Sequence, residues 1–245
     1  MTETPYRTAL IVGVGSGLSA SLARLFSKNG MKVALGARRA DGLGALAKEV
    51  GGKAFACNAA DTKEVAKLFA DVEAAFGAPD VVVYNASYRT RGPFAELNPE
   101  EVAKSIAVSA FGGFLVAQEA VKRMLPKGQG AGRDAGHAAG HGAIIFTGAS
   151  ASVKGYAQSA PFAMGKFALR GLAQSLAREL QPQGIHVAHV VIDGGIRSER
   201  RPDPADRPDS FLDPDAIAQS YLHLLQQHRS AWAWEIELRP WVERF

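Results

Sequence analysis

Hydrophobic residues recur along this chain in two alternating patterns. Short, almost entirely apolar runs are followed by longer stretches in which apolar residues return every three or four positions. The first pattern predicts strands buried on both faces, and the second predicts amphipathic helices. The predicted strands are TALIVGV, KVALGAR, AFAC, DVVVYNA, GAIIFTG, HVAHVVI and WEIEL. The predicted helices end near Ser27, Val50 and Phe76 or extend across 99–125 and 159–181. This alternation predicts a doubly wound α/β fold, with a seven-stranded, mostly parallel sheet and helices on both faces.

Two segments depart from the alternation. Residues 127–142 are rich in Gly, Ala and His, so we expect a mobile loop there. A metal site at His137 and His141 is the less favoured alternative, because no third ligand accompanies these two side chains. Residues 197–214 hold four prolines and many charges. This second segment is expected to be either a substrate lid or a plain surface loop.

Composition narrows the class of protein. The 245 residues are 47% hydrophobic and 21% charged, as in a globular protein with a substantial core, and we expect one domain over 1–245. The net charge of +4 comes from scattered Lys and Arg, which disfavours nucleic-acid binding and suits an anionic ligand. The single Cys57 is interpreted as structural. Without a signal core or a long apolar run, we expect a cytoplasmic protein with no membrane partner.

A glycine-rich turn follows the first strand and leads directly into a helix. It consists of Gly13, Val14, Gly15, Ser16, Gly17 and Leu18. Glycines at such a turn let backbone amides approach a pyrophosphate at the helix N-terminus, although a tight turn without ligand is the simpler alternative. The second strand ends in Arg38 and Arg39, with no carboxylate to bind a ribose 2′-hydroxyl. Unless these arginines only solvate a loop, they favour NADP(H), with NAD(H) as the alternative cofactor.

These motifs together resemble the short-chain dehydrogenase/reductase family over nearly the whole chain. The glycine turn, the Arg-Arg pair, YNAS in place of the family's NNAG, and the helix with Lys166 occur in family order. The resemblance implies a Rossmann fold, a nicotinamide cofactor, a small-molecule substrate and a homodimer or homotetramer. The cofactor positions that it carries over, beyond the glycine turn and the arginines, are Asn58, Ala59, Asn85, Ala86, Ser87, Lys166, Asp193, Gly194 and Ile196. The third glycine of the family's motif is Ser19, and its adenine-contacting Asp is Asn58.

The catalytic positions of that family are altered in this sequence. Its Asn, Ser and Tyr correspond to Ser109, Ala149 and Phe162, so that only Lys166 is retained. Phe162 lies one helical turn before Lys166 and has no proton to donate to a carbonyl oxygen. Loss of a positioned general acid typically costs about 10²- to 10⁴-fold in rate. The retained Lys166 still implies a contact with the nicotinamide ribose.

Several routes around the missing acid stay open. Tyr156, with Ser150 as a possible neighbour, could supply the proton, although Tyr156 also fits a substrate wall or the surface. A substrate such as an iminium or an activated alkene would need no protonated oxygen. We therefore predict an NADP(H)-dependent oxidoreductase of unknown substrate with non-standard proton handling. The alternatives are a catalytically silent NADP(H)-binding sensor or scaffold and an α/β subunit that binds no nucleotide.

The end of the sequence is rich in aromatic residues. Exposing Trp232, Trp234, Trp241 and Phe245 together would create an apolar patch, so we expect the core or a second subunit to cover them. The family resemblance implies association through the fourth and fifth long helices and the last strand.

Overall fold

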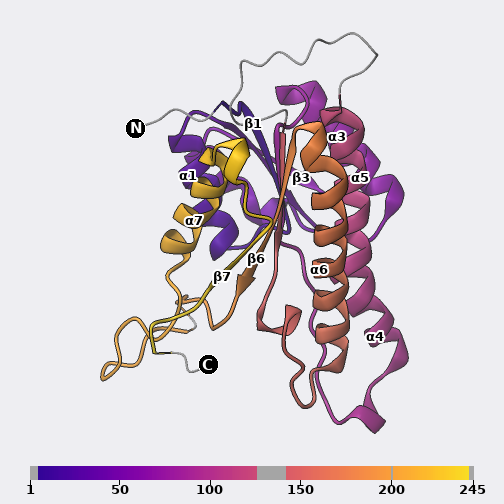
Figure 1. Ribbon diagram of the computed structural model, residues 1–245, viewed down its shortest axis with the longest axis vertical. Helices are drawn as coiled ribbons and strands as arrows, with labels where there is room; N and C mark the ends of the chain where they lie inside the picture. Colours follow the sequence, from indigo (N-terminus) through magenta and orange to yellow (C-terminus); the bar gives the residue numbers. More distant parts are fainter. Residues whose placement is uncertain (1–4, 126–141, 200, 243–245) are drawn as a thin grey trace.

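A seven-stranded parallel sheet forms the centre of the protein, as the alternation predicted (Figure 1). The computed structural model describes residues 5–125, 142–199 and 201–242. The strand order is β3-β2-β1-β4-β5-β6-β7, and neighbouring strands are all parallel. The strands are β1 (Thr8–Val12), β2 (Lys32–Ala37), β3 (Lys53–Ala56), β4 (Val81–Tyr84), β5 (Gly142–Thr147), β6 (Ile185–Ile192) and β7 (Glu235–Leu238). The order reverses between β1 and β4, which is where doubly wound sheets bind ligands.

Helices cover both faces of the sheet. Two apolar clusters, one on each face, fill the space between the helices and the strands. On one face lie α1 (Leu18–Lys28), α2 (Gly44–Glu49) and α7 (Pro214–Gln226). On the other face lie α3 (Thr62–Phe76), α5 (Gly112–Met124) and α6 (Ala160–Leu180), with α4 (Pro99–Ile106) beside α6 (Figure 1). In the described part of the chain, no helix is both long and apolar enough to span a membrane.

The helix expected across 99–125 is in fact interrupted. A π-helical turn, Ala107–Phe111, separates α4 from α5. A π turn adds a residue to the helical repeat, which a search for a 3.6-residue period does not reveal. Helix α6 packs closely here, since a Cβ added at Gly165 would lie 2.7 Å from the Cβ of Ser109. The interruption therefore places Ser109 directly against α6.

One helix was not predicted from the sequence, and one predicted loop lies mostly outside the described residues. Helix α7 was not among the predicted helices, although Asp213 caps it by accepting hydrogen bonds from the amides of Asp215 and Ala216. The expected loop 127–142 lies outside the described residues except for Gly142, which begins β5. His137 and His141 lie outside them as well.

The parallel strands bring their carboxyl ends to one edge of the sheet. The segments that follow β4, β5 and β6, together with the start of α6, lie along this edge (Figure 1). The chain therefore collects most of its predicted site residues on one side of the molecule.

Candidate functional site

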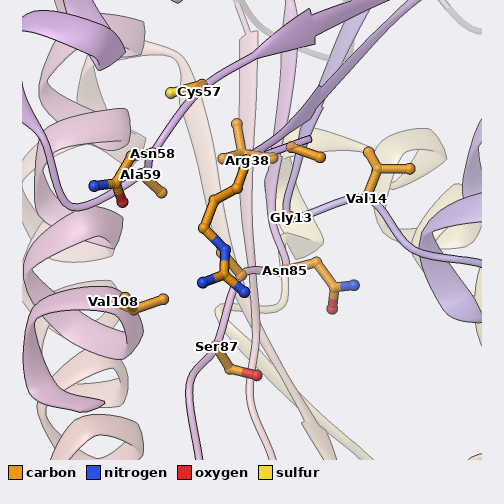
Figure 2. Close-up of a pocket in the computed structure, with 12 residues that line it drawn as sticks. Gly13, Val14, Arg38, Cys57, Asn58, Ala59, Asn85, Ser87 and Val108 are labelled. Atoms are coloured by element: carbon orange, nitrogen blue, oxygen red, sulfur yellow. The ribbon is translucent and has the colours of Figure 1, made fainter. Parts of the chain in front are cut away.

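A pocket of about 270 Å³ opens at the carboxyl ends of β1 to β4 (Figure 2). Its lining residues are Val12, Gly13, Val14, Ala37, Arg38, Cys57, Asn58, Ala59, Asn85, Ala86, Ser87 and Val108. The predicted cofactor residues among them are Gly13, Arg38, Asn58, Ala59, Asn85, Ala86 and Ser87. The volume lies at the small end of the range for ligand pockets, ~300–1,000 Å³. The pocket therefore suits one part of a dinucleotide, on the side of the sheet where an adenosine would lie.

The glycine turn fits a pyrophosphate in three respects. A Cβ added at Gly15 or Gly17 would meet nothing within 4 Å, so the space beside the backbone is open. Helix α1 starts directly after Gly17, without a side-chain cap and without an acidic residue in its first turn. Its free amides and positive partial charge are therefore available to an anion.

Ser19, which replaces the third glycine of the family motif, fastens this turn to the neighbouring strand. Its buried hydroxyl donates to the carbonyl of Gly13 over 3.1 Å and accepts from Nδ2 of Asn85 over 2.6 Å. Gly13 itself approaches the loop after β4, where an added Cβ would lie 2.3 Å from the amide nitrogen of Ala86. The serine thus orients Asn85 at the pocket wall. Sequence reasoning treated Ser19 only as a departure from the motif and missed this role.

Arg38 extends from the end of β2 into the pocket, with its guanidinium directed toward Ser87 and Val108 (Figure 2). Arg39 is exposed and does not belong to the lining. Cys57 lines the pocket but is almost fully buried, and burial raises the pKa of its thiol to about 12. Such a thiol stays protonated, which agrees with the structural interpretation of Cys57.

Lys166 is buried near the carboxyl end of β5. Its side chain is 3% exposed, and its ammonium donates a hydrogen bond to the carbonyl of Thr147 over 2.7 Å. Burial lowers the pKa of Lys166 from 10.5 to about 8. The group is still mostly protonated at neutral pH, yet it lies close enough to its pKa to lose the proton in mild alkali.

Two cations lie near the ring of Phe162. Nζ of Lys166 is 5.8 Å from the centre of its ring, and the guanidinium carbon of Arg89 is 5.0 Å from the same point. Such contacts are attractive, because the face of an aromatic ring is negative. The ring therefore interacts with both the buried ammonium and the arginine.

None of the nearby tyrosines takes the place of Phe162. Tyr156 lies in the turn before α6, and 49% of its surface is exposed. Tyr84 is fully buried and donates its hydroxyl hydrogen to the carbonyl of Val108. Tyr88 bonds through its hydroxyl to Glu101. Of the three, Tyr156 is the most exposed residue.

Ser150 contacts Asp193 rather than a tyrosine. Burial by itself would raise the pKa of the Asp193 carboxyl. The ammonium of Lys154 at 2.8 Å, the hydroxyl of Ser150 and the guanidinium of Arg239 at 3.3 Å outweigh burial and lower this pKa. Asp193 is therefore an ionised carboxylate with cationic partners from two segments.

The remaining predicted site residues lie on the same edge of the sheet as the pocket. Gly15, Ser16, Gly17 and Leu18 form the glycine turn, outside the lining of the pocket. Ile196 pairs with Leu212 through the carbonyl of Gly195 and the amide of Arg197, so this pairing does not use its own amide. An added Cβ at Gly194 would lie 2.7 Å from Pro240. The segment after β6 is thus held close to the segment after β7.

A buried polar network behind the site was not foreseen from the sequence. His189 bonds through Nδ1 to Glu235 over 2.9 Å and lies 3.4 Å from the Ser152 hydroxyl through Nε2. Glu235 also accepts two hydrogen bonds from Arg170. Burial lowers the pKa of His189 to about 4, so the ring is neutral at pH 7. Because these residues are far apart in the sequence, no local motif could have indicated the network.

The segment 197–214 is organised around one arginine. Arg197 forms ion pairs with Asp203, Asp209 and Asp213. Asp203 also accepts a hydrogen bond from the amide of Phe211 over 2.9 Å. These contacts fold the segment back onto the end of β6.

The aromatic residues near the end of the sequence differ in exposure. Trp232 stacks on His186 with ring centres 4.8 Å apart, and Trp234 lies 5.7 Å from the guanidinium of Arg170. Trp241 is 79% exposed, whereas Phe245 lies outside the described residues. The core therefore covers part of this group and leaves Trp241 on the surface.

Known proteins resemble this chain in both sequence and structure. The sequence model for short chain dehydrogenases matches residues 7–204. D-threitol dehydrogenase of Mycolicibacterium smegmatis is 30% identical over 186 residues, which cover 74% of this chain and 67% of the relative. A short-chain dehydrogenase structure from Rhodopseudomonas palustris aligns with a TM-score of 0.77 and 33% identity over 96% of this chain and 99% of its own. A metagenomic short-chain oxidoreductase in complex with NADP aligns with a TM-score of 0.78 and 28% identity, over 96% and 97%.

Proposed function

This chain belongs to the short-chain dehydrogenase/reductase family and is an oxidoreductase of that type, and we propose that it uses NADP(H) and handles protons in a non-standard way. The observation that carries the cofactor proposal is Arg38, which extends into the pocket where the second strand ends. The metagenomic relative with bound NADP supports the same choice.

Each part of the proposed cofactor site has residues suited to it. The glycine turn would receive the pyrophosphate, Arg38 and Arg39 a 2′-phosphate, and Asn58 and Ala59 the adenine. Asn85, Ala86 and Ser87 would line the path toward the nicotinamide, with Lys166 at its ribose and Asp193, Gly194 and Ile196 beside its carboxamide. A bound nicotinamide would supply or accept a hydride.

Proton handling in this site cannot follow the tyrosine route, because Phe162 carries no hydroxyl. Two of the chain's own groups remain as candidates. Tyr156 is an exposed residue in the turn before α6, and Ser150 is in contact with the ionised carboxylate of Asp193. We propose that either one of these hydroxyls exchanges the proton or the substrate is an iminium or activated alkene that water can protonate. The segment 197–214 is proposed to cover the substrate as a lid.

The cofactor proposal is tested by titration with NADPH and NADH, followed by nucleotide fluorescence and melting temperature. A ligand that binds only the folded state raises the melting temperature. We expect tighter binding of NADPH, and we expect Arg38→Ala to weaken NADPH by about tenfold or more while changing NADH little, since a charge-assisted contact is worth ~1.5–3 kcal/mol. Arg178→Ala is the control, because Arg178 donates a hydrogen bond to the carbonyl of Gln174 in its own helix. Equal weakening of both nucleotides by Arg38→Ala would contradict the assignment of the 2′-phosphate.

Catalysis is tested separately with a panel of carbonyls, imines and enones. Oxidation of NADPH above the buffer rate supports the oxidoreductase mechanism. If NADPH binds tightly and no compound is reduced, the protein acts instead as an NADP(H)-binding sensor or scaffold.

A further inference from the structure

Three arginines from two segments lie close enough together for the charges of two of them to act on the third. Arg89 and Arg91 belong to the loop after β4, and Arg201 belongs to the segment after β6. The guanidinium of Arg89 lies over the Phe162 ring, 5.0 Å from its centre. Arg201 lies over Phe211 and close to Gly195, where an added Cβ would be 3.0 Å from its Nη1. Arg201 therefore lies near the segment that directly follows β6.

The positive charges of Arg91 and Arg201 act unfavourably on the charge of Arg89. Burial and the charges of Arg91 and Arg201 lower the pKa of Arg89. Within the described ranges, no carboxylate forms an ion pair with Arg89, Arg91 or Arg201. Other arginines at this edge do have such partners: Arg197 pairs with three aspartates and Arg239 with two carboxylates.

The start of α6 adds to the positive character of the same place. This 21-residue helix has no acidic residue in its first turn and no side chain that caps it. Ser159, the residue before it, keeps a buried hydroxyl that has no hydrogen-bond partner among the described residues. A backbone hydrogen bond of 3.2 Å from Gly92 to Gln158 holds the arginine loop against this end of the helix. The positive end of the helix dipole and the arginines therefore converge.

We propose that the substrate carries an oxyanion group, a carboxylate or a phosphate, and that Arg89 and Arg201 bind it above Phe162. This inference rests on the proposed oxidoreductase function and specifies the substrate class of that site. Guanidinium groups suit such ligands because their fork of N–H donors matches the two oxygens of a carboxylate or phosphate. Phe162 then serves as an apolar platform for Arg89. A tyrosine at this position would have added a polar hydroxyl to that platform. Arg201 couples binding of the anion to the segment 197–214.

Binding of small anions to the intact protein tests the proposal. Benzoate, acetate and phenyl phosphate are titrated calorimetrically, each beside a neutral counterpart: benzamide, acetamide and phenol. The titrations are run with and without saturating NADPH. We expect at least one anion to bind about tenfold or more tightly than its counterpart, and Arg89→Gln and Arg201→Gln each to remove about that factor. Arg229→Gln, at an exposed position on a different segment, should leave the affinity unchanged.

The variants also show which molecule supplies the anion. If the oxyanion belongs to the substrate, Arg89→Gln keeps the NADPH affinity of the unaltered protein within about twofold. If Arg89→Gln weakens NADPH instead and leaves benzoate binding unchanged, the arginines serve the cofactor's phosphates and the proposal is overturned. Equal affinity for every anion and its neutral counterpart overturns it as well.

Failure of the cofactor proposal has a different signature. It would appear as a lack of NADPH binding by the unaltered protein, whereas the anion titrations without NADPH would still report on the arginine cluster. Melting curves of Arg201→Gln show whether the segment 197–214 remains folded, and Arg89→Gln tests the site without altering that segment.

Discussion

At the scale of single residues, Lys166 combines a positive charge with a site almost closed to water. Its ammonium donates a hydrogen bond to the carbonyl of Thr147 and lies 5.8 Å from the centre of the Phe162 ring. A charge in such surroundings is less stable than in water, which explains the pKa of about 8. A ligand that offers hydroxyl oxygens to this ammonium would restore part of the lost solvation.

This pKa leads to a pH-dependent prediction. If NADPH binds the protonated Lys166, its affinity should be constant below pH 8 and fall above it by up to about tenfold per pH unit. Lys166→Met should bind weakly and show little pH dependence between pH 7 and 9. Lys104→Met, at an exposed lysine, should retain the decline. Nucleotide fluorescence at each pH measures the affinity, and a decline that persists in Lys166→Met would refute the assignment.

The same group affects stability in the opposite direction. The folded protein releases this proton near pH 8, whereas the unfolded chain keeps it until its ordinary pKa of 10.5. Between these values the unfolded state binds more protons, so the contribution of Lys166 to the free energy of unfolding rises with pH. Below pH 8 the buried charge opposes folding.

At the scale of elements, the contact between the glycine turn and the loop after β4 forms one wall of the pocket. Gly13 has a φ of +91°, and an added Cβ would lie 2.3 Å from the backbone of Ala86. We expect Gly13→Ala to lower the free energy of unfolding by at least about 1–3 kcal/mol, because both strain and overlap oppose it.

Gly15→Ala provides the matched control for Gly13→Ala. Gly15 lies two residues further along the same turn, and its added Cβ would meet nothing within 4 Å. We expect its effect on stability to stay within about 0.5 kcal/mol. Urea unfolding measures both variants, and similar losses for the two would contradict the importance of the close approach.

The elements also show which features can be read from a sequence. The strands were predicted because β1, β4, β5 and β6 are buried on both faces, which leaves continuous apolar runs. The π turn at Ala107–Phe111 was not predicted, because its extra residue depends on packing against α6. Gly13 and Arg38 could be placed from local motifs, whereas the Ser19 to Asn85 bond and the His189 network join distant segments. Local patterns predict elements and turns, and contacts across the sheet require the fold.

At the scale of the whole molecule, an apolar face on neighbouring helices supports the expected oligomer. Phe111 and Phe114 stack with ring centres 6.0 Å apart, and Met164 and Phe167 on α6 are about as exposed as these rings. Members of the family usually form oligomers, and the resemblance already implied association through these long helices. We propose that this face packs against the same face of a second copy, because isolated exposed aromatic clusters of this kind are unusual in monomers.

Sedimentation velocity tests this assembly. The double variant Phe114→Glu, Phe167→Glu should sediment as a monomer, since it would bury two carboxylates in the proposed interface. Phe94→Glu is the control, because Phe94 is 82% exposed and belongs to a short 3-10 helix after β4 rather than to α5 or α6. An unchanged sedimentation coefficient for the double variant would rule out this face as the interface.

The ion pairs of Asp193 have a consequence for biosynthesis. Asp193 and His189 are made before their partners Arg239 and Glu235, which lie beyond α7 in the sequence. During synthesis the first six strands can associate before Arg239 is made. The Asp193 carboxylate, which is buried in the folded protein, then still lacks this cation. The segment around β7 therefore completes the electrostatics of the site last, and a nascent chain that pauses before residue 235 would expose a sheet edge and a solvated Asp193 to chaperones.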